Sequence, residues 1–225
     1  MDLTAELVAL AERTLPDPGP EPGTRDHTED EIAAMAHQVM AEHRPDPFWV
    51  FAYGSLIWNP EFEIVEQRKA VLPGWHRSFC FKLTRWRGTR ELPALMMALD
   101  RGGTCVGMAY RLPAGNTHAQ IMKLLDRELD ANPPTNVARW VEVTTAEGRV
   151  KALAFVASRK GPAYAGKLPL HHVAHVLARA AGHWGSAAQY AYNTISKLEE
   201  HGIRDRNLWH IQKLMAAEIR KMHNR

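Results

Sequence analysis

The chain has 225 residues, of which 45% are hydrophobic and 24% are charged, so its composition is that of an ordinary globular protein with one large domain or two small ones. The net charge of +3 is too small to indicate a nucleic-acid-binding protein, although it would not repel an anionic metabolite. No run of 18 apolar residues occurs, so we expect no membrane span.

The two cysteines, Cys80 and Cys105, each lie in an apolar run typical of a strand. Two buried thiols in a chain of this length fit a reducing compartment better than a disulfide framework. The N-terminal stretch contains early acids and no basic segment, so it does not resemble a secretory signal. We therefore expect a cytoplasmic protein.

Residues 1–47 are predicted to be an N-terminal extension. A short amphipathic helix is predicted over 1–14, and the four prolines between residues 16 and 22 favour an extended linker after it. Thr28 and Glu31 have the spacing of a capping box and predict the start of a second helix, which the segment Pro45-Asp46-Pro47 ends.

Short strands dominate the middle of the chain, and apolar residues with period-two spacing are clearest along 137–143. Turn signals separate the strands at Pro73-Gly74, Gly102-Gly103 and Glu147-Gly148. The predicted strands cover 48–53, 68–72, 77–84, 94–99, 104–112, 137–145 and 149–157.

One helix, over 116–130, interrupts the strand series. Three more are predicted over 168–181, 186–201 and 205–223, and Gly202 is a suitable C-cap for the middle one. Many short strands with one internal helix and helices afterwards indicate an α+β fold, with a small mixed β-barrel-like sheet and helices packed outside it.

The stretch that follows the first predicted strand interrupts an apolar run with Tyr53-Gly54-Ser55 and then returns to Leu56-Ile57-Trp58. A glycine permits a close backbone approach or a positive φ. A turn at the end of a strand can also point successive N–H groups at one spot and so bind an anion. A plain strand-to-loop turn is the alternative interpretation.

Glu128 is the most unusual residue of the helix predicted over 116–130. It follows Ile121, Leu124 and Leu125 at helical spacing and so falls within their apolar stripe. Such a carboxylate is either bonded to backbone N–H groups or to an arginine such as Arg77 or Arg111, or is a desolvated base with a raised pKa.

Several segments resemble, in the same order, the ChaC-like γ-glutamylcyclotransferases over about residues 48–212 of this chain. The residues that carry the resemblance are "YGSLIW" (53–58), "PGWHRSFCF" (73–81), "RGTRELPALMMALDRGGTCVGMAYRL" (87–112), "RELDAN" (127–132), "RWVEV" (139–143), "KALAFVA" (151–157), "YAGKL" (164–168) and "GIRDRNLWHI" (202–211).

The resemblance implies that residues 48–225 form a catalytic domain with a barrel-like fold, no cofactor and no metal. It implies a small-molecule substrate, glutathione. In the implied reaction the α-amine of the glutamyl group attacks within the same molecule, and the products are 5-oxoproline and Cys-Gly. The family's catalytic glutamate, a general base and then acid, corresponds to Glu128. The turn that holds the γ-glutamyl group corresponds to Tyr53, Gly54, Ser55 and Leu56, and Tyr164 matches a tyrosine expected to line the pocket.

The chain departs from the family pattern in three places. Leu129 stands where a methionine is usual, a change expected to be harmless. Residues 131–134 stand where an aromatic residue is more frequent, so part of the substrate pocket is expected to differ. Residues 1–47 are not a general feature of the family.

Other interpretations stay open beside this one. The alternatives are a cyclotransferase for other γ-glutamyl amines or amino acids, and a non-catalytic binding or regulatory module on the same fold. His171 and His175 have a spacing that can hold a metal, but no further carboxylate or cysteine ligand stands out nearby, so a solvated or partly packed face is favoured. The basic run 85–90 and the C-terminal tail are expected to be solvated surfaces and not nucleic-acid contacts, and no pattern indicates an oligomeric state.

Overall fold

The computed structural model of the chain describes residues 1–43, 46–129 and 132–224. The chain forms two compact units. The first comprises Met1–Gly23, Phe79–Met97 and Ala163–Arg225, and the second comprises Thr24–Ser78 and Ala98–Pro162. The predicted helix end at Pro45 and the last position of the helix predicted over 116–130 lie outside the described residues.

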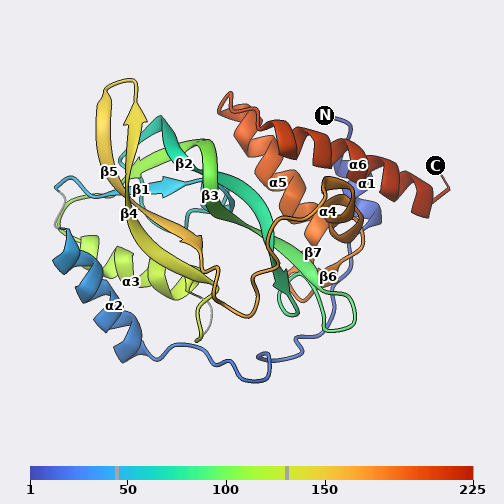
Figure 1. Cartoon of the computed structure of the whole chain (residues 1–225), viewed down its shortest axis with the longest axis horizontal. Helices are drawn as coiled ribbons and strands as arrows, with labels where there is room; N and C mark the ends of the chain where they lie inside the picture. Colours follow the sequence, from blue (N-terminus) through green and yellow to red (C-terminus); the bar gives the residue numbers. More distant parts are fainter. Residues whose placement is uncertain (44–45, 130–131, 225) are drawn as a thin grey trace. The chain divides into compact units, whose positions relative to one another are not determined.

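A closed barrel of five strands is built on the second unit (Figure 1). The order around the barrel is β1-β3-β2-β4-β5, and β1 runs antiparallel to β3 but parallel to β5. The predicted mixed barrel is therefore confirmed. The strands are β1 (Trp49–Ala52), β2 (Glu66–Leu83), β3 (Ala94–Arg111), β4 (Asn136–Thr145) and β5 (Gly148–Ala157).

β2 and β3 are each one long strand, where the sequence analysis predicted two strands with a turn between them. Gly74 has φ +80°, and Gly102 and Gly103 have φ +104° and +71°, so these glycines lie inside the strands. Glycines at positive φ let a strand bend sharply without ending, which closure of a small barrel requires. The third predicted turn, at Glu147-Gly148, does separate two strands and joins β4 to β5.

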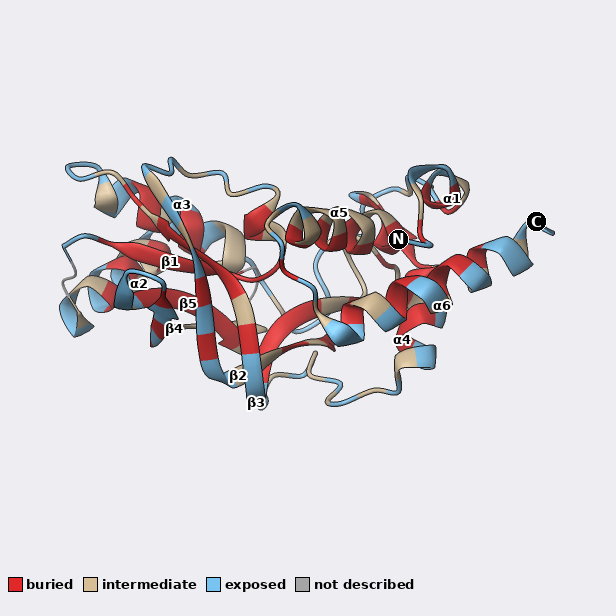
Figure 2. Ribbon diagram, turned by 90° about the horizontal axis from the view of Figure 1, so that it is seen from above, coloured by how far each residue is buried: buried red, intermediate tan, exposed pale blue. Residues whose placement is uncertain are grey.

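The strands of the second unit are buried along much of their length (Figure 2), and residues from all five belong to one core. Val141 and Val143 are buried whereas Glu142 between them is exposed, as the period-two pattern predicted. Cys105 belongs to this core and Cys80 is buried in the first unit, and neither forms a disulfide. Tyr53 also belongs to the core, so the turn after β1 starts from a fixed residue.

Two helices accompany the barrel in the second unit, α2 (Glu29–Glu42) and α3 (Thr117–Glu128), and they pack against each other (Figure 1). α2 begins with the predicted capping box, in which Thr28 and Glu31 bond each other's backbone. α3 buries Gln120, Ile121, Leu124 and Leu125. Its apolar stripe therefore leads directly to Glu128, the last residue of the helix.

The first unit is helical apart from the ends of β2 and β3 and a short β6–β7 hairpin. Ile203 N donates to Leu198 O at 2.8 Å and Gly202 has φ +64°, which confirms the predicted C-cap. The helix predicted over 168–181 ends earlier because the hairpin begins at Ala181. The elements are α1 (Ala5–Leu10), α4 (Leu170–Leu177), β6 (Ala181–Gly182), β7 (Gly185–Ser186), α5 (Ala187–Glu200) and α6 (Arg206–Met222).

Residues 1–23 belong to the first unit and residues 24–43 to the second. Within the first unit, α1 packs against α5 and α6. Within the second, α2 packs against α3. A boundary between an extension and a catalytic domain at residue 47 stays a prediction.

Candidate active site

The turn at Tyr53-Gly54-Ser55 follows β1 directly in the second unit. Residues Ser55–Ile57 form the short 3-10 helix η1, in which Ile57 N donates to Gly54 O at 3.0 Å. Asn59 N donates to Ser55 O at 2.8 Å and closes the turn. Gly54 has φ −137°. The expectation that a positive φ explains the glycine at this position is therefore wrong.

A close approach between strands lies at the base of the turn. Gly107 of β3 faces the end of β1, and a Cβ at this position would press on the carbonyl of Ala52 and lie 2.7 Å from the ring of Phe51. Such a distance is too short for any side chain. The end of β1 is therefore held against β3 backbone to backbone.

A buried arginine supports the turn from β2. Arg77 is 5% exposed, and its Nε donates to the carbonyl oxygen of Tyr53 at 2.7 Å. Its Nη2 donates to the carbonyl of Val106. Arg77 and Arg111 were considered only as possible partners for Glu128; the bonds of Arg77 to these carbonyls were not predicted, and Arg111 Nε lies 2.8 Å from Glu66 Oε2. No periodic or motif signal pointed to this use of Arg77.

Glu128 is largely covered, as its place after the apolar stripe predicted. Its side chain is 13% exposed, and its Oε1 lies 3.3 Å from Nε of Arg127. Asn136, at the start of β4, donates from Nδ2 to the carbonyl oxygen of Glu128 at 3.4 Å. The backbone at Glu128 is therefore fixed between the end of α3 and the start of β4, and its carboxylate lies beside Arg127.

Arg127 joins Glu128 to the segment that follows the turn. The side chain of Arg127 is only 17% exposed. Its Nη1 donates to the carbonyl of Asn59 and lies 3.1 Å from Oε1 of Glu61. Because Asn59 is itself bonded to Ser55, Arg127 connects the carboxylate with the turn through one intervening residue.

The loop after the turn has a second attachment to α3. Gln120 is 5% exposed, and its Oε1 accepts a hydrogen bond from Glu63 N at 2.9 Å. A buried amide with a backbone partner is satisfied and well placed. The loop between the turn and β2 is thus bonded to α3 both near its start and at its end.

Tyr164, the remaining predicted site residue, belongs to the first unit. It forms an isolated antiparallel bridge with Phe81, and the two rings meet edge to face with centroids 6.4 Å apart. Ala165 N donates to Cys80 O at 2.7 Å and fixes the same segment. A role for Tyr164 in lining the pocket stays a prediction.

The described residues contain no group of three histidine, cysteine or acidic side chains arranged to hold a metal ion. His175, which was considered with His171 for such a site, lies 3.6 Å from Glu218 on α6. Among the helices of residues 1–43, 46–129 and 132–224, none is both long and apolar enough to cross a membrane.

The architecture is similar to that of a solved glutathione-specific γ-glutamyl cyclotransferase from yeast. The TM-score is 0.69 at 19% sequence identity, and the match covers 76% of this chain and 96% of the yeast chain. The fold is therefore that of the γ-glutamylcyclotransferases.

The sequence matches the family model described as "ChaC-like protein" over residues 48–218. A glutathione-specific γ-glutamylcyclotransferase of Escherichia coli (strain K12) is 34% identical over 181 residues, which are 80% of this chain and 78% of that protein. A γ-glutamylcyclotransferase 2-1 of Arabidopsis thaliana is 32% identical over 152 residues, or 64% and 70% of the two chains. The chain belongs to the ChaC-like family, which confirms the resemblance seen in its motifs.

Proposed function

We propose that this protein is a γ-glutamylcyclotransferase that converts glutathione to 5-oxoproline and Cys-Gly. The observation that carries the proposal is the covered carboxylate of Glu128, joined through Arg127 and Asn59 to the Tyr-Gly-Ser turn. The names of the relatives from Escherichia coli and Arabidopsis thaliana support this reaction type, and the Escherichia coli name supports glutathione as the substrate.

Glu128 is proposed to carry the proton in this reaction. The α-amine of the glutamyl group attacks the δ-carbonyl, so that a new C–N bond closes the five-membered ring while the bond to the cysteinyl nitrogen breaks. The amine loses a proton to the carboxylate of Glu128, and the same carboxyl group then protonates the leaving nitrogen. No water is consumed. A single carboxylate is sufficient because the proton taken in the first step is returned in the second.

The turn after β1 is proposed to bind and orient the glutamyl group. The turn's own hydrogen bonds use the N–H groups of Ile57, Trp58 and Asn59, and not those of Gly54, Ser55 and Leu56. These three N–H groups are our candidates for contacts to the substrate carboxylate and the oxyanion. Holding an amine against a carbonyl in this way can supply about 7–11 kcal/mol in favourable cases.

Apolar side chains next to the turn are proposed to exclude water. Tyr53, Leu56 and Ile57 are all buried, and Trp58 is partly covered. A dry site strengthens each polar contact to the substrate and disfavours hydrolysis of the γ-glutamyl bond. Tyr164 is proposed as a further pocket residue on the strength of the family resemblance.

Mass spectrometry of glutathione incubated with the purified protein tests the proposal. Formation of 5-oxoproline with Cys-Gly supports it, whereas glutamate with Cys-Gly would make the protein a hydrolase. Turnover of other γ-glutamyl amines or amino acids but not of glutathione would favour the first alternative. Binding of glutathione without any product would favour a non-catalytic module.

We also propose that the protein acts in the cytoplasm, because its buried cysteines Cys80 and Cys105 form no disulfide, which fits a reducing compartment. Its proposed partner is the small-molecule substrate, and no nucleic-acid contact is part of the proposal.

A further inference from the structure

The segment before the barrel is bonded to the chain that follows Glu128. Arg25 and Asn132 form an antiparallel bridge, in which Asn132 N donates to Arg25 O at 2.8 Å and Arg25 N donates to Asn132 O at 3.3 Å. Asn132 is only four residues beyond Glu128. We call residues 24–43 the α2 segment. The residues of this segment that precede helix α2 are thus bonded, at Arg25, to the connection between α3 and β4.

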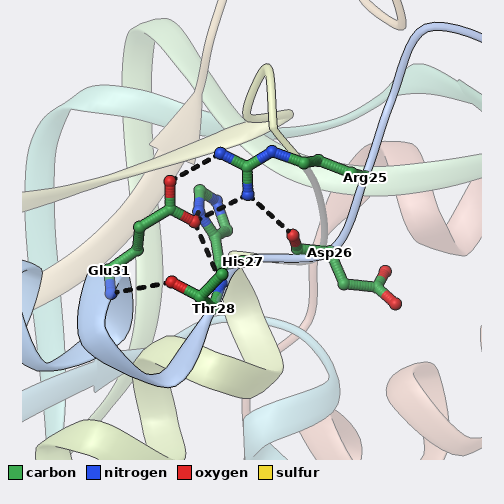
Figure 3. Close-up of polar contacts among 5 residues, drawn as sticks. All are labelled: Arg25, Asp26, His27, Thr28 and Glu31. Carbon is green, nitrogen blue, oxygen red and sulfur yellow. Dashed lines mark hydrogen bonds and ion pairs between the residues drawn. The ribbon is translucent and has the colours of Figure 1, made fainter.

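An ion pair fixes Arg25 to the first turn of α2 (Figure 3). Its Nη1 and Nη2 donate to Oε2 and Oε1 of Glu31 at 2.7 and 2.6 Å. Glu31 Oε2 also accepts from Thr28 N at 2.9 Å, and Thr28 Oγ1 accepts from Glu31 N at 3.3 Å. The same carboxylate therefore caps the helix and holds the guanidinium, so the backbone at Arg25 is tied to the helix start.

The body of α2 is attached to both elements that flank the connection. Val39 is buried on α2, and its carbonyl oxygen accepts a hydrogen bond from Trp140 Nε1 of β4 at 3.1 Å. His37 of α2 meets His118 of α3 edge to face, with ring centroids 5.9 Å apart. α3 ends at Glu128 and β4 begins at Asn136, so α2 contacts the chain on each side of the proposed catalytic residue.

We infer that the α2 segment positions Glu128 for catalysis, and that Arg25 and Glu31 are positioning residues for the proposed cyclisation. The inference rests on the proposed function. Arg25 and Glu31 touch neither the turn nor the carboxylate of Glu128 in the contacts described, so they act through the backbone of the connection. A displacement of about 1 Å at a reacting group can cost about a hundredfold in rate.

The exposure of the ion pair decides how the inference can be tested. The side chains of Arg25 and Glu31 are 55% and 35% exposed, and pairs so open to water add little to global stability. Breaking the pair should therefore loosen the connection locally and leave the folded fraction almost unchanged. A merely structural role would instead lower stability and activity together.

The experiment compares full-length wild type with Arg25→Ala, Arg25→Lys, Glu31→Gln and Arg149→Ala. Gln at position 31 retains a capping box but removes the charge that holds Arg25. Arg149→Ala is the matched control, because Arg149 forms an exposed pair with Glu142 at 3.1 Å on the β4–β5 hairpin. The readouts are kcat and KM for glutathione, the urea midpoint, and amide hydrogen exchange of a peptide that spans 124–136.

We expect Arg25→Ala and Glu31→Gln each to lower kcat about tenfold, with KM nearly unchanged and faster exchange of the peptide over 124–136. Arg25→Lys should recover part of the rate, and Arg149→Ala should behave as wild type. Wild-type kcat in Arg25→Ala, or a loss of kcat with unchanged exchange, overturns the inference while the proposed function stands. A wild-type protein that forms no 5-oxoproline overturns the proposed function itself, and the positioning role with it.

Discussion

The Nε of Arg77 lies 2.7 Å from the carbonyl oxygen of Tyr53, so a buried cation holds the residue that precedes Gly54. The same guanidinium donates to the carbonyl of Val106 on β3. One side chain from β2 therefore fixes the backbone of the turn against a neighbouring strand. Arginine suits this task because its planar fork presents several donors at fixed angles.

Arg77→Met should destabilise the protein and weaken substrate binding. Methionine fills a similar length of space but leaves the carbonyls of Tyr53 and Val106 without this donor, at a cost of about 1–3 kcal/mol in the free energy of unfolding. A loosened turn should raise KM for glutathione. Urea denaturation and steady-state kinetics measure the two effects. Arg111→Met is the control: it breaks the partly exposed pair of Arg111 with Glu66 and should change the free energy of unfolding by less than about 1 kcal/mol. Equal behaviour of both variants would show that Arg77 does not support the turn.

Glu128→Gln should keep the fold and the binding of glutathione but lose most turnover. Glutamine has the same shape and retains a hydrogen-bonding group near Arg127, yet it cannot carry the proton. We expect kcat to fall by about 10²–10⁴-fold, the range that general acid–base catalysis provides. Calorimetric titration with glutathione and the 5-oxoproline assay separate binding from turnover.

Asp126→Asn is the matched control for this prediction, since Asp126 lies on the exposed side of the same turn of α3. It should retain the wild-type rate. A Glu128→Gln variant with a near-normal rate would exclude Glu128 as the proton carrier, whatever the result for Asp126.

Gly107→Ala should strain the contact between β1 and β3 at the base of the turn. The added methyl group would meet the carbonyl of Ala52 and the ring of Phe51, and neither can move far in a packed barrel. We expect a loss of about 1–3 kcal/mol in the free energy of unfolding and a lower kcat/KM. Thr144→Ala, at an exposed position of β4, is the control and should stay within about 0.5 kcal/mol of wild type. A fully stable Gly107→Ala protein would contradict the close approach.

Much of the secondary structure could be predicted because local signals determine it. The capping box at Thr28 and Glu31 and the C-cap at Gly202 both occur as expected, since each depends on residues a few positions apart. The long strands β2 and β3 were wrongly divided at Gly74 and Gly102-Gly103. A glycine at positive φ is compatible with either a turn or a bend within a strand, and barrel closure, which is a tertiary requirement, selects the bend.

The candidate site could be predicted only in part, because some of its contacts depend on tertiary structure. Helical spacing was sufficient to predict that Glu128 is covered, because that depends on the apolar face of α3. The contact of Arg127 with Asn59 could not be predicted, since a long flexible side chain can fold across the helix end toward a distant acceptor. The use of Arg77 also depends on strand register, which no single segment specifies.

Glu31 should add a small stabilisation at neutral pH that is lost in acid, small because its pair with Arg25 is open to water. Its bonds to Arg25 and to the backbone N–H of Thr28 lower the pKa of its carboxyl from 4.5 to about 2. The folded state thus favours the ionised form, so the stabilisation is complete above the unfolded pKa and is lost as pH falls from about 4.5 toward about 2. In urea titrations, the difference in stability between wild type and Glu31→Gln should be constant at neutral pH and shrink through this acid window. The difference in stability between wild type and Asp17→Asn should shrink over a similar acid range, because the hydrogen bond from Arg85 lowers the pKa of Asp17 from 3.8 to about 2. A difference between wild type and Glu31→Gln that stays constant down to about pH 3 would mean that the Arg25–Glu31 pair does not form in solution.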